Sequence, residues 1–107
     1  MSFNIEVTDN FKRRVKLVLR KFPSFKQELG TLINSLEENP MQGTPMGHSC
    51  YKIRLAIKSK GKGKSGGARI ITHVYVSETI VYLLTIYDKS DQENISDNEL
   101  KELLTNL

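Results

Sequence analysis

The sequence of 107 residues lacks several features that define common protein classes. It has one cysteine, Cys50, which excludes an internal disulfide framework and a zinc site built from several cysteines. Its longest apolar run, residues 80–86, is interrupted by Thr85 and is far shorter than the roughly 20 residues of a transmembrane helix. The first residues contain no apolar stretch of signal-peptide length. We therefore expect a cytoplasmic protein with no membrane partner.

Acidic residues are missing from one long stretch, Asn39 to Ser77. This stretch carries a formal charge of +7, whereas residues 1–38 carry +2, residues 78–107 carry −5 and the whole chain carries +4. Ordinary protein surfaces mix charges of both signs. The segregation therefore favours a polyanionic partner such as a nucleic acid. The alternative is a solvated sheet face that keeps a small protein soluble.

The spacing of apolar residues predicts seven secondary-structure elements. They are strands over 3–8, 51–58, 68–76 and 79–87, and helices over 9–22, 24–39 and 96–107. The intervening residues 40–50 and 59–67 are rich in proline, glycine or lysine, which predicts loops. The order β-α-α-β-β-β-α predicts one α+β domain over residues 1–107, in which an antiparallel-hairpin sheet packs against a helical hairpin and a C-terminal helix.

Capping residues mark the starts of the three predicted helices. We expect Asp9 to cap the first helix. Ser24 is followed three residues later by Gln27, and Ser96 by Glu99, which predicts a capping box at the start of each of the other two helices.

Alternation along two predicted strands places basic side chains on polar faces. Matching faces of strands joined by a hairpin lie side by side, so Lys52, Arg54 and Lys58 of one strand and Arg69 and His73 of the next are expected to form one patch. Tyr75 is expected nearby, and a flexible loop beside the patch carries Lys60, Lys62 and Lys64. Fixed cations next to a flexible basic loop are typical of phosphate-backbone binding, and these residues are our candidates for RNA contact.

The usual signatures of metal and nucleotide sites are missing. Two histidines, His48 and His73, are too few for a recognisable metal site, and the glycines do not form a Walker pattern. We therefore expect neither a metal nor a small-molecule cofactor. Cys50 is expected to be a small core residue, and its alternative is a reactive thiol. For His73 the alternatives are a partly exposed strand residue and a residue that binds or acts on substrate.

Four segments resemble, in order and spacing, the RelE/ParE superfamily of toxins from bacterial toxin–antitoxin modules, and most of all its RelE and HigB branches. The segments are Cys50–Leu55, Gly66–Ile71, Val81–Lys89 and Ile95–Leu100. The resemblance covers essentially the whole chain, including the helical hairpin, and it implies a RelE-like fold.

The resemblance also implies an activity and partners. Such toxins are ribosome-dependent endoribonucleases that cut mRNA without a metal: the ribose 2′-OH attacks the adjacent phosphate. Lys52 and Arg54 match basic residues that hold RNA and assist at the 2′-OH, Arg69 matches the arginine that clamps the scissile phosphate, and Lys89 matches an arginine proposed to protonate the leaving oxygen. The implied partners are a cognate antitoxin, the ribosome and mRNA.

Two positions depart from the pattern of RelE. Ile95 stands where RelE has a tyrosine, and Lys89 is a point charge where a planar guanidinium would bind phosphate in two places. His73, Tyr75 or Tyr87 are candidates for the missing stacking or proton transfer. One alternative function is therefore a ParE-like or catalytically weak RelE-fold protein that binds antitoxin or another macromolecule without cleaving RNA. Another is a free-standing nucleic-acid-binding domain.

Overall fold

The computed structural model describes residues 2–61 and 63–107 as a five-stranded sheet with three helices. The strands lie in the order β1-β5-β4-β3-β2, and the β1–β5 pair is parallel whereas the other pairs are antiparallel. The elements are β1 (Asn4–Val7), α1 (Asp9–Lys21), α2 (Phe25–Glu38), β2 (Thr44–Gly47), β3 (Cys50–Leu55), β4 (Ala68–Tyr75), β5 (Ile80–Asp88) and α3 (Asp97–Thr105). In the described part of the chain, no helix is long and apolar enough to cross a membrane.

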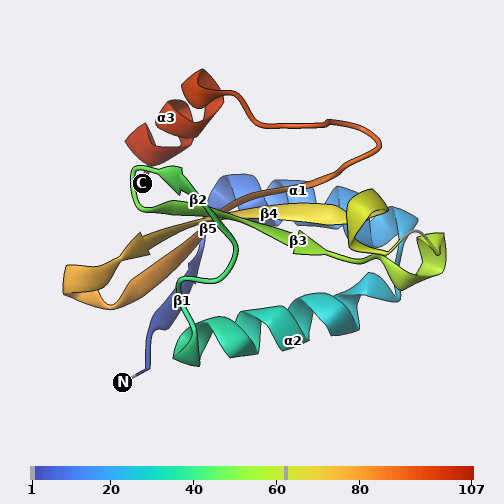
Figure 1. The fold of residues 1–107 in the computed structure, drawn as a ribbon, viewed down its shortest axis with the longest axis horizontal. Helices are drawn as coiled ribbons and strands as arrows, with labels where there is room; N and C mark the ends of the chain where they lie inside the picture. The colour runs from blue at the N-terminus through green and yellow to red at the C-terminus, as the bar shows by residue number, and fades with distance from the viewer. Residues whose placement is uncertain (1, 62) are drawn as a thin grey trace.

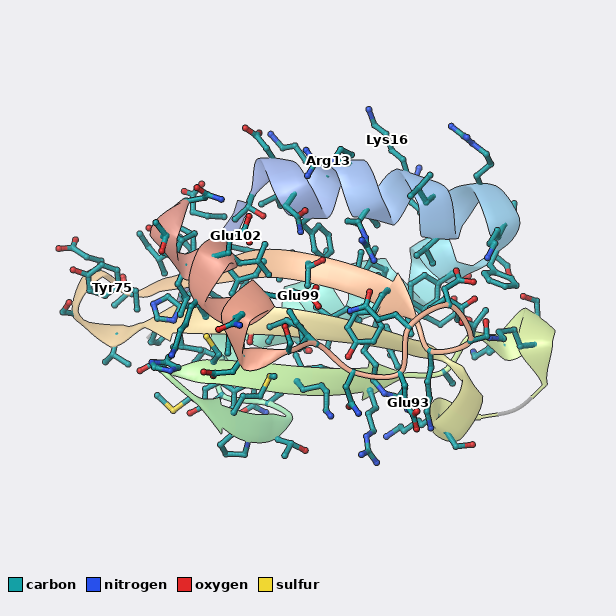
Figure 2. All side chains as sticks on the ribbon, turned by 90° about the horizontal axis from the view of Figure 1, so that it is seen from above. Arg13, Lys16, Tyr75, Glu93, Glu99 and Glu102 are labelled. Atoms are coloured by element: carbon teal, nitrogen blue, oxygen red, sulfur yellow. The ribbon has the colours of Figure 1, made fainter. Side chains whose placement is uncertain are left out.

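Helices cover the sheet on both faces. Figure 1 shows α2 on one face and α3 on the other, and Figure 2 shows α1 running beside β5. The apolar stripes of α1 and α2 pack on the same face of the sheet, which confirms the prediction that both helices cover one sheet. This larger core contains Phe11, Val18, Phe25, Leu29, Leu32, Leu36, Ile53, Ile70, Leu83 and Ile86, among others. Each large side chain that it buries contributes about 1.5 to 3 kcal/mol of transfer free energy.

A smaller core lies between the opposite face of the sheet and α3. It contains Cys50, Ile71, Leu84, Tyr87 and Leu100. The predicted capping box at the start of α3 is confirmed, because the Glu99 backbone N–H donates to Ser96 Oγ at 3.1 Å and the Ser96 hydroxyl lies 3.4 Å from Glu99 Oε1. The cap fixes where α3 begins, and Leu100 then packs in this smaller core.

The predicted loop 40–50 contains a strand, β2, that the sequence analysis missed. β2 pairs with β3 at the edge of the sheet through an irregular register between Pro45 and Gly47. An edge strand tolerates proline because one side of it needs no hydrogen-bond donors. Gly43 precedes β2 with φ +99°, and a Cβ there would lie 2.5 Å from the Lys52 carbonyl oxygen. The same prolines and glycines that predicted a loop therefore permit a short edge strand.

Two predicted helix caps are wrong. Thr8, not Asp9, caps α1, because its Oγ1 accepts a hydrogen bond from the Phe11 backbone N–H at 3.2 Å. Ser24 precedes α2 with φ −66° and ψ −19° and makes no side-chain capping bond. A capping side chain normally needs an extended backbone to reach the exposed N–H groups, and Ser24 is already helical.

Candidate active site

The strand register brings three basic residues together on the face that α3 covers. Arg54 of β3 lies directly opposite Arg69 of β4, and Lys52 lies opposite Ile71 on the same face. The prediction that these three side chains share a face is confirmed. We call Lys52, Arg54 and Arg69 the basic cluster.

Arg69 is buried, with an exposed fraction of 3%. Its Nη1 donates to the carbonyl oxygens of Lys64 at 2.8 Å and Ala68 at 3.2 Å, and its Nη2 donates to that of Ser65 at 3.3 Å. No carboxylate in the described part of the chain forms an ion pair with it. Burial, and then the charge of Arg54, lower the pKa of Arg69 from its ordinary value. The main chain therefore orients a guanidinium whose charge no acid neutralises.

The pairing of Arg54 with Arg69 opposes folding. Residues directly opposite each other on antiparallel strands have Cβ atoms about 4.5 to 5.5 Å apart, and like charges at this separation are destabilising. The exposed Arg54 thus adds positive charge where Arg69 is already uncompensated. An anion bound between the two side chains would relieve this repulsion, and guanidinium groups suit phosphate in geometry and charge.

Lys52, a member of the cluster, and Lys89, which follows β5, are held by different contacts. Lys52 Nζ lies 3.5 Å from Oδ1 of Asn94, in the segment that connects β5 to α3. The Lys89 backbone N–H donates to the Gly67 carbonyl oxygen at 3.0 Å, so Lys89 follows β5 beside the start of β4. A Cβ at Gly67 would overlap the Leu55 carbonyl oxygen, and only glycine fits this approach of the two strands.

Lys58 does not belong to the predicted patch. The pairing of β3 with β4 ends at Leu55 and Ala68, and Ile57 is fully buried in the larger core on the other side of the sheet. Lys58 then begins a short 3₁₀ turn, and its Nζ lies 3.9 Å from Glu28 Oε1 of α2. The strand parity that placed Lys58 beside Lys52 and Arg54 therefore fails where the strand ends.

Lys60 is not a free loop lysine. Its Nζ forms a 2.7 Å ion pair with Asp88 Oδ1, and the two side chains are only 13% and 2% exposed. The same ammonium lies 5.6 Å from the centre of the Phe22 ring. The pair attaches the Lys60 turn to the end of β5. Lys62 lies outside the described residues.

Lys64 is the loop lysine that adjoins the basic cluster. It is exposed and begins a second 3₁₀ turn, Lys64–Gly66, whose carbonyl groups hold Arg69. With Lys52 and Arg54 it lines a surface cavity of about 360 Å³ beside β3.

His73 and Tyr75 lie farther along β4 than Arg69, and only Tyr75 is remote from the whole basic cluster, because His73 pairs with Cys50, two residues from Lys52. At about 3.3 Å per residue, His73 is roughly 13 Å and Tyr75 roughly 20 Å along β4 from Arg69. The His73 ring stacks on Tyr82 with centroids 6.2 Å apart, and Figure 2 shows Tyr75 at the far end of the sheet. The expectation that Tyr75 lies near the patch is therefore wrong.

Cys50 is a core residue, as expected. It is 1% exposed, its Sγ lies 3.6 Å from His73 Nδ1, and burial raises the pKa of its thiol to about 11. A neutral buried thiol is a poor nucleophile. Among the described residues no group of three or more His, Cys, Asp or Glu side chains could hold a metal ion.

Sequence reasoning missed the partners of the predicted lysines. Asn94, which contacts Lys52, lies in a polar connector where nothing distinguishes it from its neighbours. Asp88 did carry a signal, because it ends an apolar strand and an acid in that position needs a cation.

Comparison with known proteins identifies the family. A sequence model of the family described as the RelE toxin of the RelE/RelB toxin–antitoxin system matches residues 9–106. The chain belongs to the RelE toxin family. It is similar to the free E. coli toxin RelE, solved as a double mutant, with a TM-score of 0.62 and 18% identity over 98% of this chain and 97% of that one. It is also similar to the isolated E. coli RelE toxin, with a TM-score of 0.56 and 18% identity over 99% and 100% of the chains.

The RelE family assignment agrees with the α+β architecture described above, and the similarity in structure shows a RelE fold. The observed element order differs from the predicted one only by the additional strand β2 and the short 3₁₀ turns. In this RelE fold, the basic cluster lies on the neighbouring antiparallel strands β3 and β4, on the face of the sheet against which α3 packs.

Proposed function

We propose that this protein is the toxin of a toxin–antitoxin pair and a ribosome-dependent endoribonuclease that cuts mRNA. The single observation that carries the proposal is the juxtaposition of Arg54 and Arg69, two like charges on one face with which no acid of residues 2–61 and 63–107 forms an ion pair. A fold stabilised only by its own contacts has no use for this arrangement, whereas a phosphate-binding site does.

The proposed reaction is an internal transfer of a phosphoryl group. The 2′-oxygen attacks the adjacent phosphorus, the P–O5′ bond breaks, and the products are a 2′,3′-cyclic phosphate and a 5′-hydroxyl. Negative charge grows on the non-bridging oxygens, where Arg69 and Arg54 stabilise it. Lys52 holds the 2′-hydroxyl and assists its deprotonation, with the proton passing to solvent, and the Lys89 ammonium gives a proton to O5′, so the protons balance.

The proposed partners follow from charge. Ribosomes and mRNA in the cytoplasm supply the polyanion, and a cognate antitoxin would inhibit the toxin by covering the basic cluster. An acidic segment of the antitoxin would neutralise Arg54 and Lys52, which are the more accessible members of the cluster.

Purified protein added to a reconstituted translation reaction is expected to cut mRNA within translated codons. Primer extension locates the cuts, and the fragments should end in a 2′,3′-cyclic phosphate and a 5′-hydroxyl. The same mRNA without ribosomes is the control and should stay intact. Growth arrest by the expressed protein with intact mRNA and altered DNA supercoiling would instead support a ParE-like function.

Neutralising Lys64 is expected to weaken RNA binding, whereas neutralising Lys58 is not. Lys64 lines the cavity beside the basic cluster, and Lys58 lies near Glu28 of α2, so the two lysines of adjoining turns differ in position and not in charge. Lys64→Gln should reduce the slope of log binding constant against log salt concentration by about 1. Lys58→Gln is the matched control. Equal losses in the two variants would show that RNA contacts both turns.

A further inference from the structure

The hydroxyl of Tyr87 is buried without a hydrogen-bond partner among the described residues. Tyr87 is 2% exposed, and its ring packs in the smaller core with Leu84 and Leu100. A buried polar group left unpaired costs about 1 to 3 kcal/mol of stability. A phenylalanine would fill the same space without that cost, so packing explains the ring and leaves the hydroxyl unexplained.

The neighbour of Tyr87 across the sheet is Arg69, which also has unused donors. Tyr87 of β5 lies directly opposite Arg69 of β4 on the face of the basic cluster. A guanidinium carries five N–H donors. Three of those of Arg69 are used, two at Nη1 and one at Nη2. Among the described residues, the Nε–H and one Nη2–H find no acceptor, and a guanidinium binds an oxyanion in two places through such a pair of donors.

Two charges of opposite sign act on the Tyr87 hydroxyl. Burial raises the pKa of the phenol, and the charge of Arg69 opposes this effect and lowers it. Glu99 of α3 is the other titratable group that acts on the phenol, and it raises the pKa. Glu99 does not hydrogen-bond to Tyr87, and its carboxylate lies near Ser96 instead. Figure 2 shows Glu99 projecting from α3 over the sheet.

We propose that the Tyr87 hydroxyl and the free edge of Arg69 together form a phosphate-binding site, in which Tyr87 donates a hydrogen bond to a non-bridging phosphate oxygen. The inference rests on the proposed function to the extent that this phosphate is the scissile one. Both side chains come from neighbouring strands and are more than nine-tenths buried, so the donors are held in place before a ligand arrives.

Residues of a turn and of a connector lie next to the site. On the Arg69 side lies the main chain of Lys64 and Ser65, which are both exposed residues. On the Tyr87 side lies Ile95, which is partly buried and belongs to the 89–96 connector without helix or strand. A phosphate therefore reaches the site when the 89–96 connector or the Lys64–Gly66 turn shifts, while the strands stay in place.

Tyr87→Phe tests the inference because it removes only the hydroxyl. Inorganic phosphate is expected to shift the Arg69 Nε–H resonance of the wild-type protein in NMR titrations and to bind Tyr87→Phe about 10-fold to 100-fold more weakly. Cleavage of translated mRNA under single-turnover conditions should slow by a similar factor. The melting temperature of Tyr87→Phe should stay the same or rise, because an unpaired buried hydroxyl is lost.

Tyr82→Phe is the matched control. Tyr82 belongs to the same strand but stacks on His73, away from Arg69, and its substitution should change neither phosphate binding nor cleavage. The inference is overturned if phosphate leaves the Arg69 resonance unmoved, if Tyr87→Phe binds phosphate like the wild type, or if it melts at a clearly lower temperature. Phosphate binding that depends on Tyr87 without any mRNA cleavage would support the site and refute the nuclease. Cleavage of mRNA at the wild-type rate by Tyr87→Phe would support the nuclease and refute the role of Tyr87 in the phosphate site.

Discussion

Arg69→Lys is expected to reduce mRNA cleavage by about 10²-fold to 10³-fold, which is the usual effect of removing one donor that stabilises a transition state. Lysine keeps the positive charge, but an ammonium cannot donate to the Lys64, Ala68 and Ser65 carbonyl oxygens and still present a planar edge to phosphate. The measurement is the single-turnover rate of cleavage of a translated mRNA.

The control for this prediction is Arg20→Lys. Arg20 is exposed on α1, so the same chemical change there should leave cleavage unaffected. Circular dichroism of Arg69→Lys should confirm that the fold is kept. A cleavage rate within threefold of wild type would show that charge alone matters at position 69 and would contradict the proposed role of the guanidinium.

Among the variants considered, Lys60→Met is expected to lower the free energy of unfolding the most. It leaves the Asp88 carboxylate, which is 2% exposed, without its cation, and breaking a buried ion pair in this way costs about 3 to 5 kcal/mol. For a domain of this size the melting temperature should fall by at least about 12 °C, measured by differential scanning calorimetry. Lys58→Met is the control, because Lys58 is exposed and its nearest carboxylate is 3.9 Å away.

The pH dependence of stability should change sign in Lys60→Met. In the wild type, burial favours raising the Asp88 pKa, but hydrogen bonds from Lys60 and Ser90 outweigh burial and the pKa is lowered. This group therefore stabilises the fold above the unfolded pKa of about 3.9, and the contribution is lost as pH falls. Without Lys60, burial dominates, and the variant should become more stable as the pH falls toward 4. A parallel decline of wild type and variant would show that Asp88 is not coupled to Lys60.

The spacing of apolar residues predicted the helices and four of the five strands. Alternation or a helical stripe indicated most of them, whereas β5 was indicated by a continuous apolar run, and it is buried on both faces. The alternation in residues 51–55 and 68–73 was also enough to place Lys52, Arg54 and Arg69 on a common face. Alternation could not show where a strand ends, and for that reason Lys58 was placed on the wrong side. β2 was not predicted, because it is a four-residue edge strand that contains a proline and a glycine.

Burial of charged groups was beyond sequence reasoning. Lys60 and Lys64 have similar neighbours in the sequence, since both lie in the lysine- and glycine-rich segment 59–67. Lys60 nevertheless forms a buried ion pair with Asp88, whereas Lys64 is exposed. The difference arises from a contact between residues 28 positions apart. The Tyr87 hydroxyl, which has no partner among the described residues, is likewise a property of the packed structure. Its surroundings are set by side chains of α3 and β4, which are distant in the sequence.

The parallel pairing of β1 with β5 has a consequence for synthesis of the chain. Asn4 pairs with Ile80, so β1 finds its partner strand only after 76 further residues have been synthesised. At roughly 5 to 20 residues per second this wait is about 4 to 15 s. β3 and β4, which carry the basic cluster, are made during this interval, so the sheet that supports the cluster closes only once β5 has been synthesised.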